Sequence, residues 1–283
     1  QDINYKFPKL ISKKKYFSSD WDSLDHIIEN FLREECKNIE YPLTACFAIA
    51  GPVINQTAKI INLPWHISCN DLKNKFNFES VELINDFGVL LYGIPFIKKS
   101  QFSSITTGEE INSERKKLHA IVGAGTGLGI ARGIITENEI QVLGSEGGHA
   151  EFSPKSETEW EIKIWLKKNL KLERISCERI ISGVGLSRIA EWRLSKPDAK
   201  NHPFQKTIEK LKVSDDLRKK IPAQICNLSI KGDILMMEIE RIWLEAYASF
   251  IGDVAVHELC YGGLWIAGGT ASKHFKFFNS DSF

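Results

Sequence analysis

Long apolar segments and a charge imbalance are both missing from this sequence. No apolar stretch approaches the roughly 18 residues of a membrane-spanning helix, and no basic start leads into an apolar signal core. The 37 Lys and Arg residues nearly balance the 36 Asp and Glu residues, whereas nucleic-acid-binding proteins carry a basic excess. These absences argue against a membrane protein and a nucleic-acid-binding protein, and they favour a cytoplasmic location.

Paired cysteines and a P-loop are missing as well. No C-x-x-C pair occurs, so neither a zinc knuckle nor a disulfide framework is indicated, and we predict no metal ligands. We expect reduced and mostly buried thiols at the six cysteines, which are Cys36, Cys46, Cys69, Cys177, Cys226 and Cys260. No Gly-Lys pair occurs anywhere, which excludes the P-loop of nucleotide-binding proteins.

What the sequence does contain is the pattern of a mixed α/β protein. Its 283 residues, 43% of them hydrophobic, suffice for a sizeable core. Apolar spacing predicts helices over 19–36 and 233–259, and apolar runs predict strands over 44–53, 81–87, 118–122, 129–136 and 139–143. A polar stretch covers residues 100–117, and we predict a boundary near residues 94–104 between a small α/β domain, residues 1–96, and a large α/β domain, residues 97–283.

The stretch GAGTGLG, residues 123–129, places four glycines at alternate positions around Thr126. The dinucleotide fingerprint G-x-G-x-x-G/A fails in all three frames, because Leu128, Ile130 and Arg132 occupy the sixth position. The residues that follow are β-branched, so we predict a hairpin between two strands. Such a hairpin can present backbone N–H groups to an anion, and the alternative is a glycine-rich turn without a ligand.

Polar residues also follow the predicted strand 81–87. Asn85 and Asp86 stand where α/β folds place residues that face a ligand. A carboxylate there can act as a general base or hold a metal. The alternative is an Asx turn that caps the next helix.

Two further segments combine polar side chains with glycines. In GSEGGHAEF, Glu146 and His149 stand among glycines that let the backbone bend around a small ligand, although a tight exposed turn explains them too. In ISCERIISG, Ser176 is predicted as a helix N-cap with Glu178 in the first turn, where the helix dipole favours an acid. Glu178 is therefore either a capping acid or a ligand-binding residue.

Taken in order, five motifs resemble bacterial glucokinases. They are INDF (84–87), GAGTGLG (123–129), GSEGGH (144–149), ERIISG (178–183) and IAGG (266–269). The resemblance covers essentially the whole chain. It implies the two-domain, actin-like (ribonuclease H-like) sugar kinase fold, with the ligand cleft between the domains. It also implies ATP-dependent phosphorylation of glucose to glucose 6-phosphate, with Mg²⁺, and it leaves a homodimer open.

The resemblance also implies roles for individual residues. Asp86 would be the catalytic base that takes the proton of the sugar's 6-hydroxyl. Asn85, Glu146, His149 and Glu178 would bind the ring hydroxyls. The nucleotide would be bound by backbone around Gly123, Gly125, Thr126, Gly127, Gly268 and Gly269.

Some features depart from the family pattern. The related repressor and sugar-kinase group has a zinc-binding cysteine cluster after its GGH, and the segment after His149 contains no cysteine. An Asp-Gly-Gly-Thr phosphate loop and a final helix are absent, so we expect a fragment that lacks both ends and has no activity by itself. A non-catalytic sugar-binding protein of the same fold is the alternative function. A nicotinamide oxidoreductase is disfavoured by the failed glycine spacing.

Overall fold

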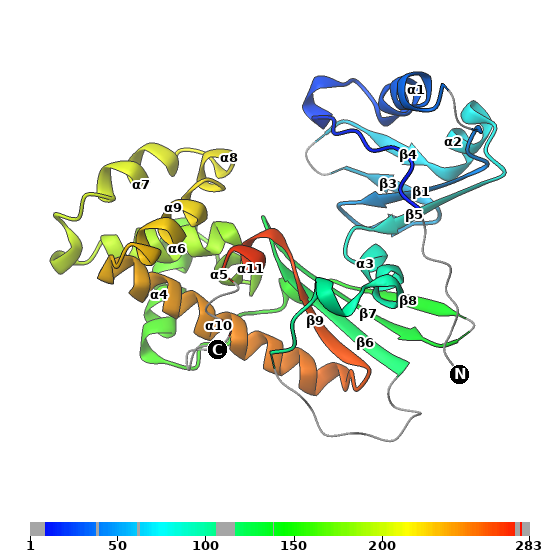
Figure 1. Ribbon diagram of the computed structural model, residues 1–283. Coiled ribbons are helices and arrows are strands. Elements are labelled where there is room, and N and C mark those ends of the chain that lie inside the picture. The colour runs from blue at the N-terminus through cyan, green and yellow to red at the C-terminus, as the bar shows by residue number, and fades with distance from the viewer. Residues whose placement is uncertain are drawn as a thin grey trace. The chain divides into compact units, whose positions relative to one another are not determined.

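Three sheets organise the described part of the chain, with two, three and four strands (Figure 1). The computed structural model describes residues 9–37, 40–60, 63–105, 117–137, 139–274 and 278. The chain divides into unit 1, Gln1–Lys98, and unit 2, Lys99–Phe283. None of the described helices combines the length and the apolar character that a bilayer-spanning helix needs.

Unit 1 contains a parallel strand pair and a small antiparallel sheet. Strands β1 and β5 pair in parallel, which brings Ile49 opposite Asn85 at their carboxyl ends. Helices α1 and α2 begin after serines, Ser23 and Ser68, whose hydroxyls accept backbone N–H bonds of the first turn. The elements are α1 (Leu24–Glu35), β1 (Thr44–Ile49), β2 (Val53–Ile54), β3 (Thr57–Lys59), β4 (His66–Ser68), α2 (Cys69–Phe76), β5 (Ser80–Asn85) and α3 (Gly88–Gly93).

Unit 2 is built on a four-stranded sheet in the order β8-β7-β6-β9. The strands are β6 (Leu118–Ala124), β7 (Leu128–Ile135), β8 (Ile140–Ser145) and β9 (Gly263–Ala267). Strands β6 and β7 form an antiparallel hairpin, and β9 runs parallel to β6. Alternate residues of β6, namely Ala120, Val122 and Ala124, are fully buried on one face and join the helical core.

Helices cover this face of the unit 2 sheet. The longest, α10 (Ile234–Glu258), starts at Asp233, whose carboxylate accepts the N–H of Met236, and it buries Trp243 and Tyr247 (Figure 1). The other helices are α4 (Glu157–Leu170), α5 (Glu178–Ile181), α6 (Gly183–Leu194), α7 (Gln205–Leu211), α8 (Asp215–Arg218), α9 (Ile221–Ile230) and α11 (Gly269–Lys273).

Several predicted elements are confirmed and one is wrong. The glycine stretch does join two strands of a hairpin, and the long helix of unit 2 begins and ends within a residue of its predicted bounds. The N-cap predicted at Ser176 is wrong. Helix α5 follows Cys177 and has no side-chain cap, because Ser176 pairs with Glu151 in an isolated antiparallel bridge. No disulfide joins any of the six cysteines, all of which lie among the described residues, and Cys69, Cys177 and Cys226 are buried.

Candidate functional site

Hydrogen bonds fix one side of the glycine hairpin of unit 2, and the tip of the hairpin is exposed. Between β6 and β7, the Gly125 N–H donates to the Gly127 carbonyl over 2.8 Å, and Thr126 is exposed. The Gly125 carbonyl accepts the N–H of Gly183 at 2.8 Å and the hydroxyl of Thr270 at 3.3 Å. Helices α6 and α11 thus fix one side of the hairpin, while its tip can meet a ligand.

A second glycine turn lies beside the hairpin, where β9 passes into α11. Gly268 has a φ of +97°, and a Cβ there would lie 2.7 Å from the carbonyl oxygen of Ala124. Only glycine suits this left-handed conformation and close approach. A Cβ at Gly269 would meet nothing within 4 Å, so the start of α11 is open. Gly123 differs from both, because it is buried in β6 between its β7 and β9 partners.

Three predicted sugar-binding side chains of unit 2 lie together. The His149 ring stands between two carboxylates, with Nε2 3.6 Å from Glu146 Oε2 and Nδ1 4.0 Å from Glu178 Oε1. These distances are too long for hydrogen bonds. The side chains are 70%, 58% and 33% exposed for Glu146, His149 and Glu178. Their polar atoms can therefore pair with the hydroxyl groups of a ligand.

Glu178 also contacts the glycine hairpin. Its Oε2 accepts the backbone N–H of Leu128, the first residue of β7, over 3.2 Å. One carboxylate thus reaches the hairpin through one oxygen and the His149 ring through the other. The neighbouring Cys177 is buried, and burial raises the pKa of its thiol to about 11. Cys177 is therefore a protonated packing residue and not a nucleophile.

The other two residues predicted to bind the sugar belong to unit 1. Asn85 binds backbone, since its Oδ1 accepts the N–H groups of Phe87 and Gly88 and its Nδ2 donates to the Gly51 carbonyl at 3.2 Å. The Asx-turn alternative thus describes Asn85. Asp86 is exposed, with one oxygen accepting the Phe87 N–H at 3.0 Å. Desolvation of its carboxyl by surrounding protein atoms raises the pKa of Asp86 above the ordinary aspartate value, although hydrogen bonds from the backbone oppose this shift.

Sequence reasoning missed three residues that position this site. Thr270 and Gly183 hold the hairpin, and the Arg174 guanidinium donates to the His149 carbonyl over 2.6 Å. Gly183 could have been found from Ser182, which precedes it and is a favourable N-cap residue. The Ser182 hydroxyl accepts the Gly185 N–H at the start of α6. Nothing in the sequence pattern pointed to Thr270 or Arg174, because their partners lie far away along the chain.

Comparisons with known proteins agree with one another. A family model described as Glucokinase matches residues 2–283. The chain is 34% identical to the glucokinase of Nostoc punctiforme over 268 residues, which cover 93% of this chain and 77% of that protein. The glucokinase of Synechocystis is 33% identical over 288 residues, covering 98% of this chain and 79% of that protein.

Solved structures show the same likeness. A crystal structure of glucokinase from an Antarctic psychrotroph has 26% identity and a TM-score of 0.74, and the match covers 94% of this chain and 76% of that one. A ROK family glucokinase from Streptomyces griseus in complex with glucose and AMPPNP has 17% identity and a TM-score of 0.55, over 92% of this chain and 76% of that one. The latter likeness shows a shared fold.

Proposed function

The chain belongs to the glucokinase family, and from this membership we propose how its residues divide the work of the reaction. The protein is a hexose phosphotransferase that transfers the γ-phosphoryl group of ATP to glucose. Its mixed α/β fold is that of the actin-like sugar kinases. The observation that carries the residue roles is the grouping of Glu146, His149 and Glu178 beside the glycine hairpin.

Glu146, His149 and Glu178 bind the hydroxyl groups of the glucose ring. A hexose hydroxyl both donates and accepts a hydrogen bond, so carboxylates and an imidazole suit it. The gaps of 3.6 and 4.0 Å beside the His149 ring support this role, because the facing polar atoms are not bonded to each other. Glu178 in addition connects the sugar-binding residues to the hairpin through Leu128.

Asp86 is the general base. It accepts the proton of the glucose 6-hydroxyl as that oxygen attacks the γ-phosphorus, and the bond from this phosphorus to the bridging oxygen of ADP breaks. Two observations support the role: the side chain is exposed, so a sugar hydroxyl can reach it, and desolvation of the carboxyl by surrounding protein atoms raises its pKa and so its basicity. Asn85 fixes the end of β5 and keeps one amide N–H for a ring hydroxyl.

The hairpin and the Gly268 turn bind ATP. Backbone N–H groups around Thr126 face the phosphates, and Gly268 with Gly269 lets the adenosine lie against the chain. Mg²⁺ neutralises phosphate charge when it is bound. The one group of three close metal-ligating side chains among the described residues lies elsewhere, buried between helices, so Mg²⁺ would enter this site together with ATP.

We propose a cytoplasmic location, because the phosphoryl donor ATP is available there. The proposed chemistry requires only one chain, one hexose and one nucleotide. It therefore gives no support to a homodimer, which stays a prediction.

The test of these roles is Asp86→Asn, which keeps the side-chain shape and removes the proton acceptor. We expect kcat to fall on the order of 10²- to 10⁴-fold, while the glucose Kd from calorimetry stays within about threefold. Asp71→Asn, an exposed carboxylate of α2 in the same unit, is the matched control. A kcat loss below about tenfold for Asp86→Asn would exclude the base assignment.

A further inference from the structure

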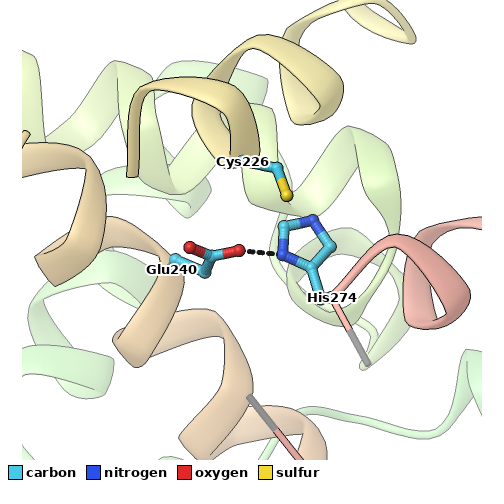
Figure 2. A group of neighbouring side chains, drawn as sticks. All are labelled: Cys226, Glu240 and His274. Carbon is cyan, nitrogen blue, oxygen red and sulfur yellow. Dashed lines mark hydrogen bonds and ion pairs between the residues drawn. The ribbon is translucent and has the colours of Figure 1, made fainter. Parts of the chain in front are cut away.

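Three side chains with metal-ligating atoms meet inside unit 2, away from the glycine hairpin. Cys226 comes from α9, Glu240 from α10, and His274 directly follows α11. One ligand atom from each lies within 4.8 Å of the other two. Figure 2 shows the sulfur and the carboxylate both directed toward the His274 ring. Among the described residues, this is the only group of three His, Cys, Asp or Glu side chains so arranged.

The cluster is almost completely shielded from solvent. The exposed fractions are 6% for Cys226, 1% for Glu240 and 0% for His274. The Trp243 ring lies against the imidazole with centroids 5.3 Å apart. Charge in such surroundings must be compensated locally, because desolvating an unpaired carboxylate costs several kcal/mol or more.

The hydrogen bonds of the cluster leave one buried carboxylate oxygen of Glu240 without a partner among the described residues. His274 Nδ1 pairs with Glu240 Oε1, and the Cys226 thiol makes a weak 3.6 Å contact to the Lys273 carbonyl. The second carboxylate oxygen, Glu240 Oε2, is buried and has no hydrogen-bond partner within the described part of the chain. A histidine and carboxylate pair alone leaves that oxygen unsatisfied, whereas a cation at the cluster satisfies it.

The ligand types select the cation. Thiolate, imidazole and carboxylate are the side chains that bind Zn²⁺, whereas Mg²⁺ and Ca²⁺ prefer oxygen alone. Zinc bonds of about 2.0–2.3 Å place tetrahedral ligand atoms about 3.3–3.8 Å apart. The ligand atoms lie within 4.8 Å of one another, so side-chain rotations must bring them into that range when the ion binds. A thiolate and a carboxylate with a neutral imidazole also cancel the charge of one divalent ion.

We propose that Cys226, Glu240 and His274 bind one Zn²⁺ ion that anchors the end of α11 to α9 and α10. Helix α11 begins at Gly269, in the turn assigned to the nucleotide, so the ion fixes the far end of that helix. On binding, the thiol proton and any proton shared between His274 and Glu240 pass to solvent. This site differs from a zinc knuckle, because its ligands come from three separate elements.

The first test measures metal in the purified 283-residue chain. Protein expressed with added Zn²⁺ and dialysed into metal-free buffer should retain close to one zinc per chain by mass spectrometry. Cys226→Ser should weaken zinc binding by more than about 100-fold, beyond the effect of losing an outer partner of a ligand. Cys69→Ser is the matched control, because Cys69 is equally buried but lies in unit 1, outside the cluster.

A second measurement needs no variant. Exchange into Co²⁺ should give a thiolate-to-cobalt charge-transfer band, and bound metal should protect Cys226, identified by peptide mass spectrometry, from alkylation. A wild-type chain with less than about a tenth of a zinc per molecule and no cobalt band would overturn the proposal. So would protection of a different cysteine, or equal zinc retention by Cys226→Ser.

Discussion

Replacing Glu178 first by Gln and then by Ala separates the two contacts assigned to this carboxylate. Its Oε2 accepts the Leu128 N–H at 3.2 Å, and its Oε1 faces the His149 ring, where the sugar is proposed to bind. In Glu178→Gln, the amide oxygen can still accept from Leu128, while the charge on the sugar side is lost. In Glu178→Ala, both contacts disappear.

The expected magnitudes follow from partial burial. A hydrogen bond to a charged group contributes about 1.5–3 kcal/mol when buried, and the Glu178 side chain is 33% exposed, which reduces that contribution. Loss of about 1 kcal/mol in Glu178→Gln corresponds to a roughly fivefold weaker glucose Kd. Glu178→Ala should weaken glucose binding about 10- to 30-fold and ATP binding about fivefold, because the hairpin loses its support.

Isothermal titration calorimetry with glucose and, separately, with ATP measures both effects. The matched control is Glu173→Gln, a carboxylate close in sequence that is fully exposed. Both Kd values of the control should stay within about twofold of wild type, as for surface substitutions in general. Circular dichroism and thermal unfolding identify any variant that has lost its fold.

The pattern of the two variants decides the outcome. If Glu178→Gln weakened glucose and ATP equally, the carboxylate would act through the fold and not through the sugar. If Glu178→Ala left the ATP Kd unchanged, the bond to Leu128 would not support the nucleotide hairpin. Either result would refute the double role of Glu178.

Three further predictions concern neighbouring positions. Desolvation raises the pKa of the Asp86 carboxyl in the folded protein. The protonated carboxyl therefore contributes to stability at low pH, and this contribution is lost as the pH rises through the raised pKa. Asp86→Asn should therefore unfold at no lower urea concentration than wild type at neutral pH, and a clear destabilisation would contradict the pKa direction. Gly148→Ala should cost more than about 2 kcal/mol by urea unfolding, because its Cβ would lie 2.1 Å from the Leu128 carbonyl oxygen, whereas Gly144→Ala meets nothing within 4 Å and should change little. Asn85→Ala should destabilise the protein by about 1–3 kcal/mol through its three backbone bonds, and an effect on glucose Kd alone, without a loss of stability, would argue against that positioning role.

The sequence by itself determined the local elements and the family. Alternating glycines flanked by β-branched residues specify a hairpin, because the dihedral preferences of those residues are local. Asp233 before an apolar helical run likewise marks the start of α10, since its carboxylate caps the first turn. The ordered motifs identified the glucokinase family for the same reason: each is a short segment whose residues can be read without knowing what packs against it.

Only the tertiary structure decided which side chains meet. Ser176 is a plausible N-cap in the sequence, yet it pairs with Glu151 of another segment. Glu178 reaches Leu128, and Cys226, Glu240 and His274 converge from three elements. Such contacts depend on how the helices pack their apolar faces on the sheet that contains β6 and β9. The free energy of this packing is a sum of contributions from the whole core. No local sequence pattern contains this information, so only the folded structure identifies these partners.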